Sequence, residues 1–237
     1  FYYETEKIIN SGAYVPRYFD YETLEGLEEL VSKHENLKKS TLGQLKKEGK
    51  ILLFKGHGSP SSDQRLGEVP YIKVSDLRSN HVNINPTNMI PLSLAKKFWK
   101  GETSGLKAYD LISPERASKN IGVFCVLMPG QEQAVLTKEV IVIRTNTELF
   151  DQFYLLWALT LKEVVSQWER IIFMQTNRED VGNRISEIQI PIPKSRKIAD
   201  ELSLDFRNYY RSIEKARKEF IDSLNKKQFN HHIYLGN

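Results

Sequence analysis

The sequence predicts an α+β protein, in which a mostly β globular domain with small helices is followed by a long helix of the coiled-coil type. From about residue 41 to residue 147, short apolar runs alternate with Pro, Gly and Asn, which is typical of strands joined by turns. After Pro193, apolar residues recur every three or four positions, the spacing of one helix face. We therefore expect an N-terminal arm with a short acidic helix (1–40), a globular domain (41–193), a long helix (194–229) and a tail (230–237).

Composition favours a cored protein that stays outside membranes. The chain has 237 residues, of which 40% are hydrophobic and 27% charged. Its longest apolar runs are too short to cross a bilayer, and it carries no secretory signal. The single cysteine, Cys125, is expected as a small core residue and fits a cytoplasmic location. The chain opens at Phe1 and not at methionine, so we expect either an excised piece or the tail of a longer protein.

The first predicted elements are short, and capping or turn residues mark their ends. Leu24, Leu27 and Leu30 would share one face of a short helix in the acidic arm. Thr41 is a suitable N-cap for a helix from Leu42 to Lys47 that Gly49 ends. A strand over 51–54 follows, and after it two glycines and a proline among serines predict a loop over 55–62.

Strands dominate the middle of the chain. We expect strands over 69–74 and 121–128, another beginning at Val135, and the clearest one over 140–144, where β-branched residues are frequent. A small helix is predicted from Leu92 to Trp99.

The last ninety residues are predicted to be mainly helical. Apolar spacing indicates a helix over 149–168, which residues 174–177 interrupt, and residues 185–193 alternate like a strand that prolines end. The helix after Pro193 carries an apolar seam that needs a partner, either its own domain or, as we favour, another helix or subunit. The seam consists of Leu202, Phe206, Tyr209, Ile213, Ala216 and Phe220.

Charge is unevenly distributed along the chain. Residues 1–30 carry two basic and seven acidic side chains, whereas residues 31–107 carry fourteen basic and six acidic ones, a net charge of +8. A positive segment of this size is expected of a surface that binds phosphates, although a solvated lysine-rich face would look the same.

The sequence offers no catalytic constellation. It lacks a phosphate-binding glycine motif, and the Asn85-Pro86 stretch does not match the Asn/Asp-Pro-Pro-aromatic motif of adenine methyltransferases. His57 has no evident nucleophile or orienting carboxylate beside it, and no residue set has metal-ligand spacing. We therefore expect a protein that binds without catalysing, and that holds neither a metal nor a cofactor.

Several segments, in order, resemble the specificity subunits of type I restriction-modification systems. The residues that carry the resemblance are the helix start at 41–45, the loop at 56–62, Val-Pro-Tyr-Ile-Lys-Val-Ser-Asp-Leu at 69–77, the turn at 113–122, and the strand with the following helix from residue 184 onward. Lys194 to Lys197 depart from the family, which often has Glu-Gln there.

The resemblance implies a target-recognition domain over 41–193 that reads double-stranded DNA, and a spacer or dimerisation helix over 194–229. It also implies a partner methyltransferase subunit, and in some systems a restriction subunit, which would hold S-adenosylmethionine, Mg and ATP. The chain would be a half-subunit that pairs with itself, or the C-terminal recognition region of a larger methyltransferase. A protein-interaction adaptor that uses the helix seam is a third alternative.

If the domain reads DNA, three groups of polar residues are candidates for base or phosphate contact. They are Lys55, His57, Ser59, Ser61, Gln64 and Arg65 in the first loop, then Arg78, Asn80 and Asn83, and finally Lys96, Lys97 and Lys107.

Overall fold

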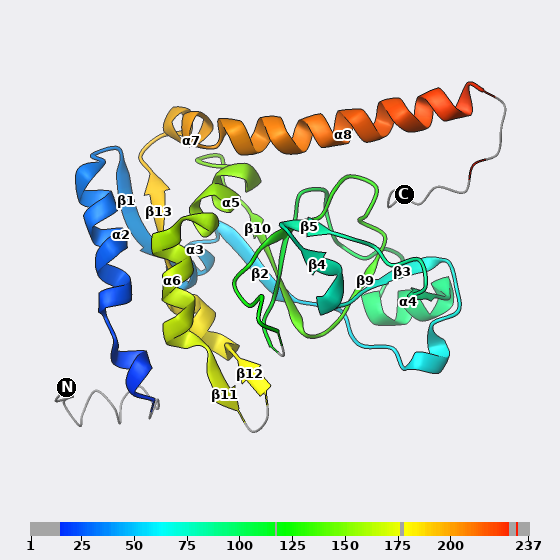
Figure 1. Ribbon diagram of the computed structural model, residues 1–237, viewed down its shortest axis with the longest axis horizontal. Coiled ribbons are helices and arrows are strands. Elements are labelled where there is room, and N and C mark those ends of the chain that lie inside the picture. The colour runs from blue at the N-terminus through cyan, green and yellow to red at the C-terminus, as the bar shows by residue number, and fades with distance from the viewer. Residues whose placement is uncertain (1–14, 117, 176–177, 228–230, 232–237) are drawn as a thin grey trace.

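The computed structural model confirms the α+β class, and it describes residues 15–116, 118–175, 178–227 and 231. A central sheet lies between a helical end that contains α2 and an opposite end that contains α4, and α8 runs along one edge of the molecule (Figure 1). The helices are η1 (Pro16–Phe19), α2 (Glu22–Lys33), α3 (Leu42–Lys47), η2 (Ser62–Gln64), η3 (Val74–Asp76), α4 (Leu92–Trp99), α5 (Gln152–Thr160), α6 (Lys162–Ile171), η4 (Gly182–Glu187), α7 (Arg196–Leu202) and α8 (Leu204–Asn225).

Six strands form the central sheet in the order β2-β10-β7-β8-β5-β4. Side chains of β10 alternate between two cores: Ile141 and Ile143 join the larger one beneath the helices, and Val140 and Val142 join a smaller one on the opposite face. The sheet is therefore buried on both faces. Its strands are β2 (Ile51–Lys55), β4 (Leu77–Arg78), β5 (His81–Val82), β7 (Leu111–Pro114), β8 (Cys125–Val126) and β10 (Val140–Thr145).

The distal lobe, as we name it, is a three-stranded sheet with α4 packed on it. Its strands are β3 (Val69–Ile72), β6 (Met89–Ile90) and β9 (Val135–Leu136), in the order β6-β3-β9. A small core of Val69, Tyr71, Ile90, Ala95 and Val135 holds it together. The α4 helix has the bounds that the sequence predicted.

The N-terminal segment is part of the folded body in the structure. β1 (Leu37–Thr41) pairs antiparallel with β13 (Gln189–Pro193), and α2 packs against α6. Pro191 and Pro193 have no N–H, so β13 bonds to β1 through its other residues. The boundary expected between residues 40 and 41 thus falls inside β1. Residues 1–14 of the expected arm and most of the expected tail lie outside the described residues.

Two helices predicted as continuous are broken. Leu161 is extended between α5 and α6, so the predicted helix over 149–168 is corrected to two helices. The hydroxyl of Thr160 bonds back to the carbonyl oxygens of Leu156 and Trp157, which competes with the helical ladder. In the same way, buried Ser203 separates α7 from α8, and its hydroxyl donates to the carbonyl oxygen of Ala199.

Some predicted strands are shorter than expected. Of residues 121–128 only β8 is a strand, because the carbonyl oxygen of Asn120 accepts the N–H of Val123 in a turn. The first half of 185–193 is the end of η4, and residues around 174–177 belong to a hairpin of β11 (Phe173–Gln175) and β12 (Arg178–Asp180) whose residues 176 and 177 lie outside the described part. None of the helices described here is both long and apolar enough to span a membrane.

Candidate nucleic-acid interface

The loop over residues 56–66 joins the central sheet to the distal lobe, and hydrogen bonds of the His57 ring hold it in place. The His57 Nδ1 accepts the N–H of Leu136 at 3.0 Å, which leaves Nε2 to donate to the carbonyl oxygen of Ser104 at 2.9 Å. Burial lowers the pKa of His57, so the neutral ring is favoured. Both ring nitrogens are occupied, and His57 is a brace of the loop, whereas the sequence marked it as a DNA contact.

Further contacts hold the 56–66 loop against the distal lobe. A Cβ on Gly58 would collide with the ring of Phe98 on α4, so the backbone can approach the helix closely only because residue 58 is glycine. The hydroxyls of Ser59 and Thr137 lie 3.1 Å apart. The loop and α4 therefore form one surface.

The end of the loop is also ordered by its own side chains. The N–H of Ser61 donates to Oε1 of Gln64 at 3.1 Å, at the start of the η2 turn. The Arg65 guanidinium donates to the carbonyl oxygen of Pro60 at 3.1 Å and lies 5.2 Å from the ring centre of Tyr71. One guanidinium nitrogen of Arg65 is therefore already hydrogen-bonded within the protein. The side chains of Ser61 and Gln64 are exposed.

The second group of candidates lies on the hairpin of β4 and β5. Ser79 and Asn80 have positive φ angles, as a tight hairpin turn requires. The Asn80 side chain donates to the carbonyl oxygen of Phe124 at 2.8 Å, so this residue too is a brace. Arg78 and Asn83 are exposed, and Nε of Arg78 donates to the carbonyl oxygen of Ser75.

The four candidate lysines come from three segments of the chain and differ in their contacts. Lys55 pairs with buried Glu115 at 2.9 Å, and Lys96 pairs with Glu102 at 2.5 Å. Within the described ranges Lys97 and Lys107 are exposed and form no ion pair. Lys97 lies on α4, whereas Lys107 borders a hollow beside α8 together with Arg144 and Arg211.

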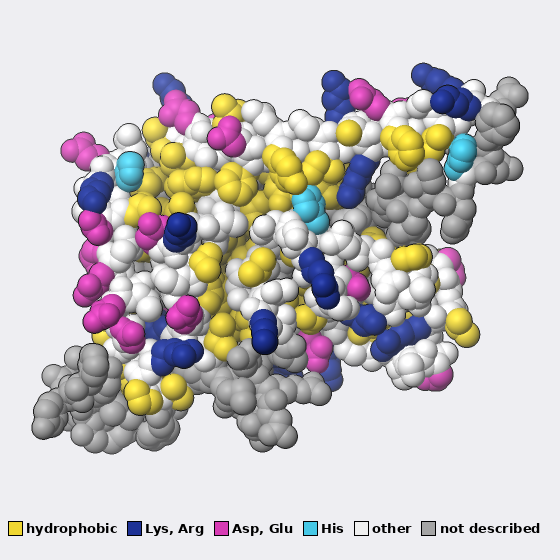
Figure 2. Space-filling model, viewed as in Figure 1, with side chains coloured by type: hydrophobic (Ala, Val, Ile, Leu, Met, Phe, Trp, Pro, Cys, Tyr) yellow, Lys and Arg dark blue, Asp and Glu magenta, His cyan; other side chains and the backbone are white. Residues whose placement is uncertain are grey.

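The positive segment 31–107 is divided in space. Its lysines between residues 33 and 50 lie on α2, β1, α3 and the start of β2, at the end of the molecule opposite α4. In Figure 2 acidic side chains gather at this same end, and the basic ones in view are scattered over the whole face. The basic residues of segment 31–107 therefore lie on elements at both ends of the molecule.

The six predicted seam residues lie on two helices, Leu202 at the end of α7 and the other five on α8, and they differ in exposure. Phe206 and Ile213 pack against the larger core together with Tyr210, which is buried. Leu202, Tyr209 and Phe220 are 37%, 54% and 46% exposed, and Ala216 is exposed as well. Part of the predicted seam thus packs on its own domain, which is the less favoured of the two expected arrangements. Leu202, Ala216 and Phe220 face outward, and Tyr209 is half exposed with its hydroxyl 3.1 Å from Nε2 of His81.

Polar and aromatic contacts fix α8 to the domain along its packed side. The Tyr210 hydroxyl donates to the carbonyl oxygen of Asn80 at 3.1 Å, and the Tyr109 hydroxyl donates to the carboxylate of Glu214 at 2.5 Å. The Arg211 guanidinium lies 4.7 Å from the ring centre of Tyr109. Tyr210 stands next to the seam position Tyr209 and was not among the predicted seam residues.

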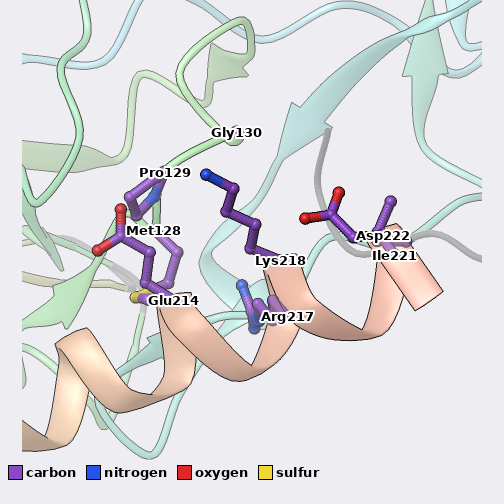
Figure 3. Close-up of a pocket in the computed structure, with 8 residues that line it drawn as sticks. All are labelled: Met128, Pro129, Gly130, Glu214, Arg217, Lys218, Ile221 and Asp222. Atoms are coloured by element: carbon purple, nitrogen blue, oxygen red, sulfur yellow. The ribbon is translucent and has the colours of Figure 1, made fainter.

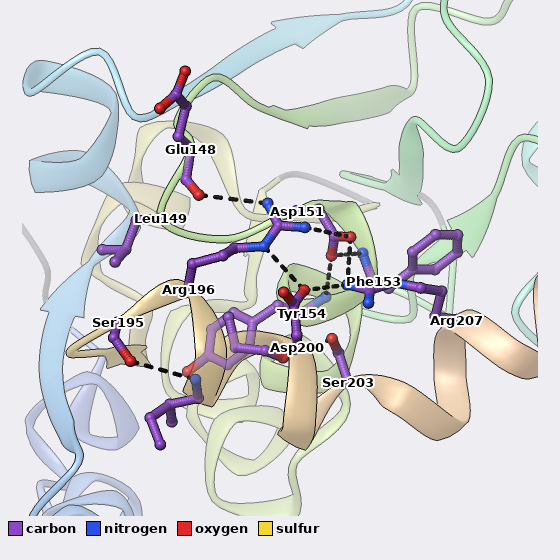
Figure 4. A network of polar contacts seen from close by, with 12 residues as sticks. Glu148, Leu149, Asp151, Phe153, Tyr154, Ser195, Arg196, Asp200, Ser203 and Arg207 are labelled. Atoms are coloured by element: carbon purple, nitrogen blue, oxygen red, sulfur yellow. Dashed lines mark hydrogen bonds and ion pairs between the residues drawn. The ribbon is translucent and has the colours of Figure 1, made fainter.

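An ion-pair network holds the corner between α7 and α8. Asp151 caps α5 by accepting the N–H groups of Phe153 and Tyr154, and it also pairs with Arg207 at 2.7 Å. Arg196 and Arg207 both reach Asp200, so the corner is tied to the start of α5 (Figure 4).

Beyond this corner, α8 leaves a hollow of about 330 Å³ against the loop at 128–130. Lys218 reaches from the helix towards the loop, with Glu214 and Asp222 on either side (Figure 3). The hollow contains both signs of charge and does not select for anions.

The fold is similar to those of three solved structures from type I restriction-modification systems. The S subunit from M. genitalium matches with a TM-score of 0.45 and 14% identity over 90% of this chain and 52% of that chain. A structure described as the structural basis underlying complex assembly and conformational transition of the type I R-M system matches with a TM-score of 0.46 and 15% identity. The match covers 94% of this chain and 53% of that chain. The HsdS subunit from Thermoanaerobacter tengcongensis matches with a TM-score of 0.46 and 13% identity, over 95% of this chain and 50% of that chain.

The chain thus spans about half the length of each of these structures. No protein-family model and no curated protein sequence matches it.

Proposed function

We propose that this chain recognises a specific sequence in double-stranded DNA and serves as the specificity module of a restriction-modification system. The observation that carries the proposal is the 56–66 loop, which is held rigidly by His57, Ser59 and Arg65 and still exposes the polar side chains of Ser61 and Gln64. A rigid loop with exposed hydrogen-bonding groups loses little conformational entropy when it meets the edges of base pairs.

Affinity would come from phosphate contacts of the exposed cations. Arg78, Lys97 and Lys107 have no ion-pair partner in the part of the chain that is described, so DNA binding would break none. Each phosphate that they neutralise would release counterions, and binding would weaken as salt rises.

Catalysis would belong to partners. The chain would direct a DNA adenine methyltransferase subunit, and in some assemblies a restriction subunit, which would bring S-adenosylmethionine, Mg and ATP. The exposed side of α7 and α8, with Leu202 on α7 and with Tyr209 and Phe220 on α8, is the surface we assign to such a partner or to a second copy of this chain. A cytoplasmic location belongs to the same proposal.

Two alternatives remain from different classes. In the first, this chain is the recognition region of a larger methyltransferase or restriction-modification fusion. In the second, it is an adaptor that binds a protein through α8, which the exposed apolar residues of that helix favour. The adaptor predicts DNA binding without sequence preference.

Selection of bound duplexes from a random-sequence library with the purified chain at moderate salt tests the proposal. We expect enrichment of a short motif, or of two copies at a fixed spacing if the chain pairs with itself. Salt-sensitive binding without a motif, both alone and with a methyltransferase subunit added, would contradict DNA recognition and favour the adaptor.

A further inference from the structure

Leu66 stands out in the 56–66 loop because its side chain is turned fully outward. It is 83% exposed, more than any other large hydrophobic residue in the described ranges. Burying a leucine side chain stabilises a fold, so the protein forgoes that stabilisation here. Single exposed leucines are common on protein surfaces, so the exposure needs to be read together with what holds the residue outward.

The backbone before Leu66 is fixed. The N–H of Arg65 donates to the carbonyl oxygen of Ser62 at 3.3 Å, and its guanidinium is tied to the carbonyl oxygen of Pro60 and lies over Tyr71. Because Arg65 is anchored at both its backbone and its side chain, the chain reaches Leu66 in a set direction.

The backbone after Leu66 is fixed as well. A Cβ on Gly67 would collide with the backbone of Ile90 and Pro91, so the chain passes directly over the start of α4. The Glu68 carboxylate accepts the N–H of Leu92 at 3.2 Å, and Val69 begins the pairing of β3 with β6. With both flanks held, Leu66 is unable to turn inward without breaking these contacts.

The neighbours of Leu66 are suited to a nucleic acid. Gln64 is exposed, and its Nε2 makes no hydrogen bond within the described chain, while Asp63 is an exposed acceptor. An outward apolar group beside a free amide donor corresponds to what the major groove displays, where the thymine methyl group is the apolar feature among the hydrogen-bonding groups of the bases.

We infer that Leu66 is a specificity-determining residue that packs against the C5-methyl group of a thymine in the major groove. This inference rests on the proposed DNA recognition and names the chemical feature that the loop reads. The Gln64 amide would bind the edge of an adjacent base, and the anchored Arg65 would keep the leucine in place.

A double-mutant cycle between protein and DNA tests the contact. Binding of the chain and of Leu66→Ala would be measured to the selected duplex and to duplexes in which each thymine in turn is replaced by deoxyuridine, which lacks the methyl group. At one position we expect the unmodified chain to bind about fourfold more weakly to the deoxyuridine duplex, the value for one buried methyl group. Leu66→Ala should bind the two duplexes equally well.

Leu52→Ala is the matched control, because Leu52 is also an exposed leucine but lies on β2 outside the loop. It should retain the full deoxyuridine effect. A deoxyuridine effect that persists in Leu66→Ala, or the absence of any sensitive thymine in an enriched motif, would overturn the role of Leu66 and leave DNA recognition intact. If no motif is enriched, the proposed function fails and the inference fails with it.

Discussion

The 56–66 loop and α8 are fixed to the same domain by different chemistry. Hydrogen bonds to backbone groups and close backbone approaches hold the loop on the small core of the distal lobe, through His57, Gly58 and Arg65. Charged pairs and aromatic rings hold α8 on the larger core, through Arg207, Tyr210 and Glu214. Because none of these loop contacts is an ion pair, the loop keeps its shape when salt or DNA phosphates change the local field, which suits a surface that meets a polyanion.

The largest expected effect is on the support of α8. Asp110 is 1% exposed and pairs through both oxygens with Arg144, which is 15% exposed. Asp110→Ala would leave a mostly buried guanidinium without its partner and should cost about 3–5 kcal/mol of unfolding free energy. Urea denaturation measures this cost.

Glu29→Ala is the control, because its pair with Lys33 is solvent-exposed and should contribute little to stability. Equal losses in the two variants would show that the segment beneath α8 does not depend on the buried pair.

A smaller effect is expected in the distal lobe. Gly58→Ala should force the ring of Phe98 aside and cost about 1–3 kcal/mol, as overpacking does. Hydrogen exchange should become faster in the 56–66 loop and α4, and remain unchanged along α8. Gly101→Ala, where the added methyl group meets no atom within 4 Å, should leave both regions as they are. Faster exchange along α8 in Gly58→Ala would mean that the two regions are not independently held.

Removing one hydroxyl should loosen α8 more gently. Tyr210→Phe deletes the hydrogen bond to the carbonyl oxygen of Asn80 and should cost about 1 kcal/mol. Tyr209→Phe removes only an exposed hydrogen bond to His81 and should cost less. A larger loss in Tyr209→Phe than in Tyr210→Phe, by thermal or urea unfolding, would argue against the assigned packed side of α8.

The smallest effect is a pH dependence of the loop. Burial lowers the folded-state pKa of His57 below its ordinary value of 6.5, so the stability it contributes is present above that value and is lost as pH falls through the lower folded-state pKa. Stability should therefore decrease from pH 7.5 to pH 5.5, and His57→Gln should reduce this decrease. His81 acts in the same direction, since burial and then the charge of Arg217 lower its pKa, so His81→Gln must be measured alongside. An unchanged pH profile in His57→Gln would contradict the role of the ring as a neutral brace.

Local patterns were enough to predict several elements from the sequence. The Thr41 cap and the run from Leu42 to Lys47 gave α3, and β-branched residues marked β10. The breaks at Leu161 and Ser203 escaped prediction because both residues stand within continuous helical spacing. The pairing of β1 with β13 joins segments about 150 residues apart, which no local pattern encodes.

The candidate site was predicted in outline and not in its details. The 56–66 loop was recognised from its glycines and proline, but His57 and Asn80 turned out to be braces. Their partners lie 79 and 44 residues away in sequence, so their inward direction depends on tertiary structure. Leu66 was overlooked because an isolated leucine in a polar loop carries no periodic signal.

The measurement that tests the central claim most directly compares the sequence preference of two variants with that of the unmodified chain. Gln64→Ala removes an exposed amide from the 56–66 loop, and Lys107→Ala removes an unpaired cation near α8. In parallel library selections, Gln64→Ala should lose the preference at one position of the motif. Lys107→Ala should keep every preference and bind all duplexes more weakly, with a salt slope reduced by about 0.9. If Gln64→Ala and the unmodified chain select the same motif with the same strength at every position, Gln64 reads no base, and the claim that this loop reads DNA loses its central support.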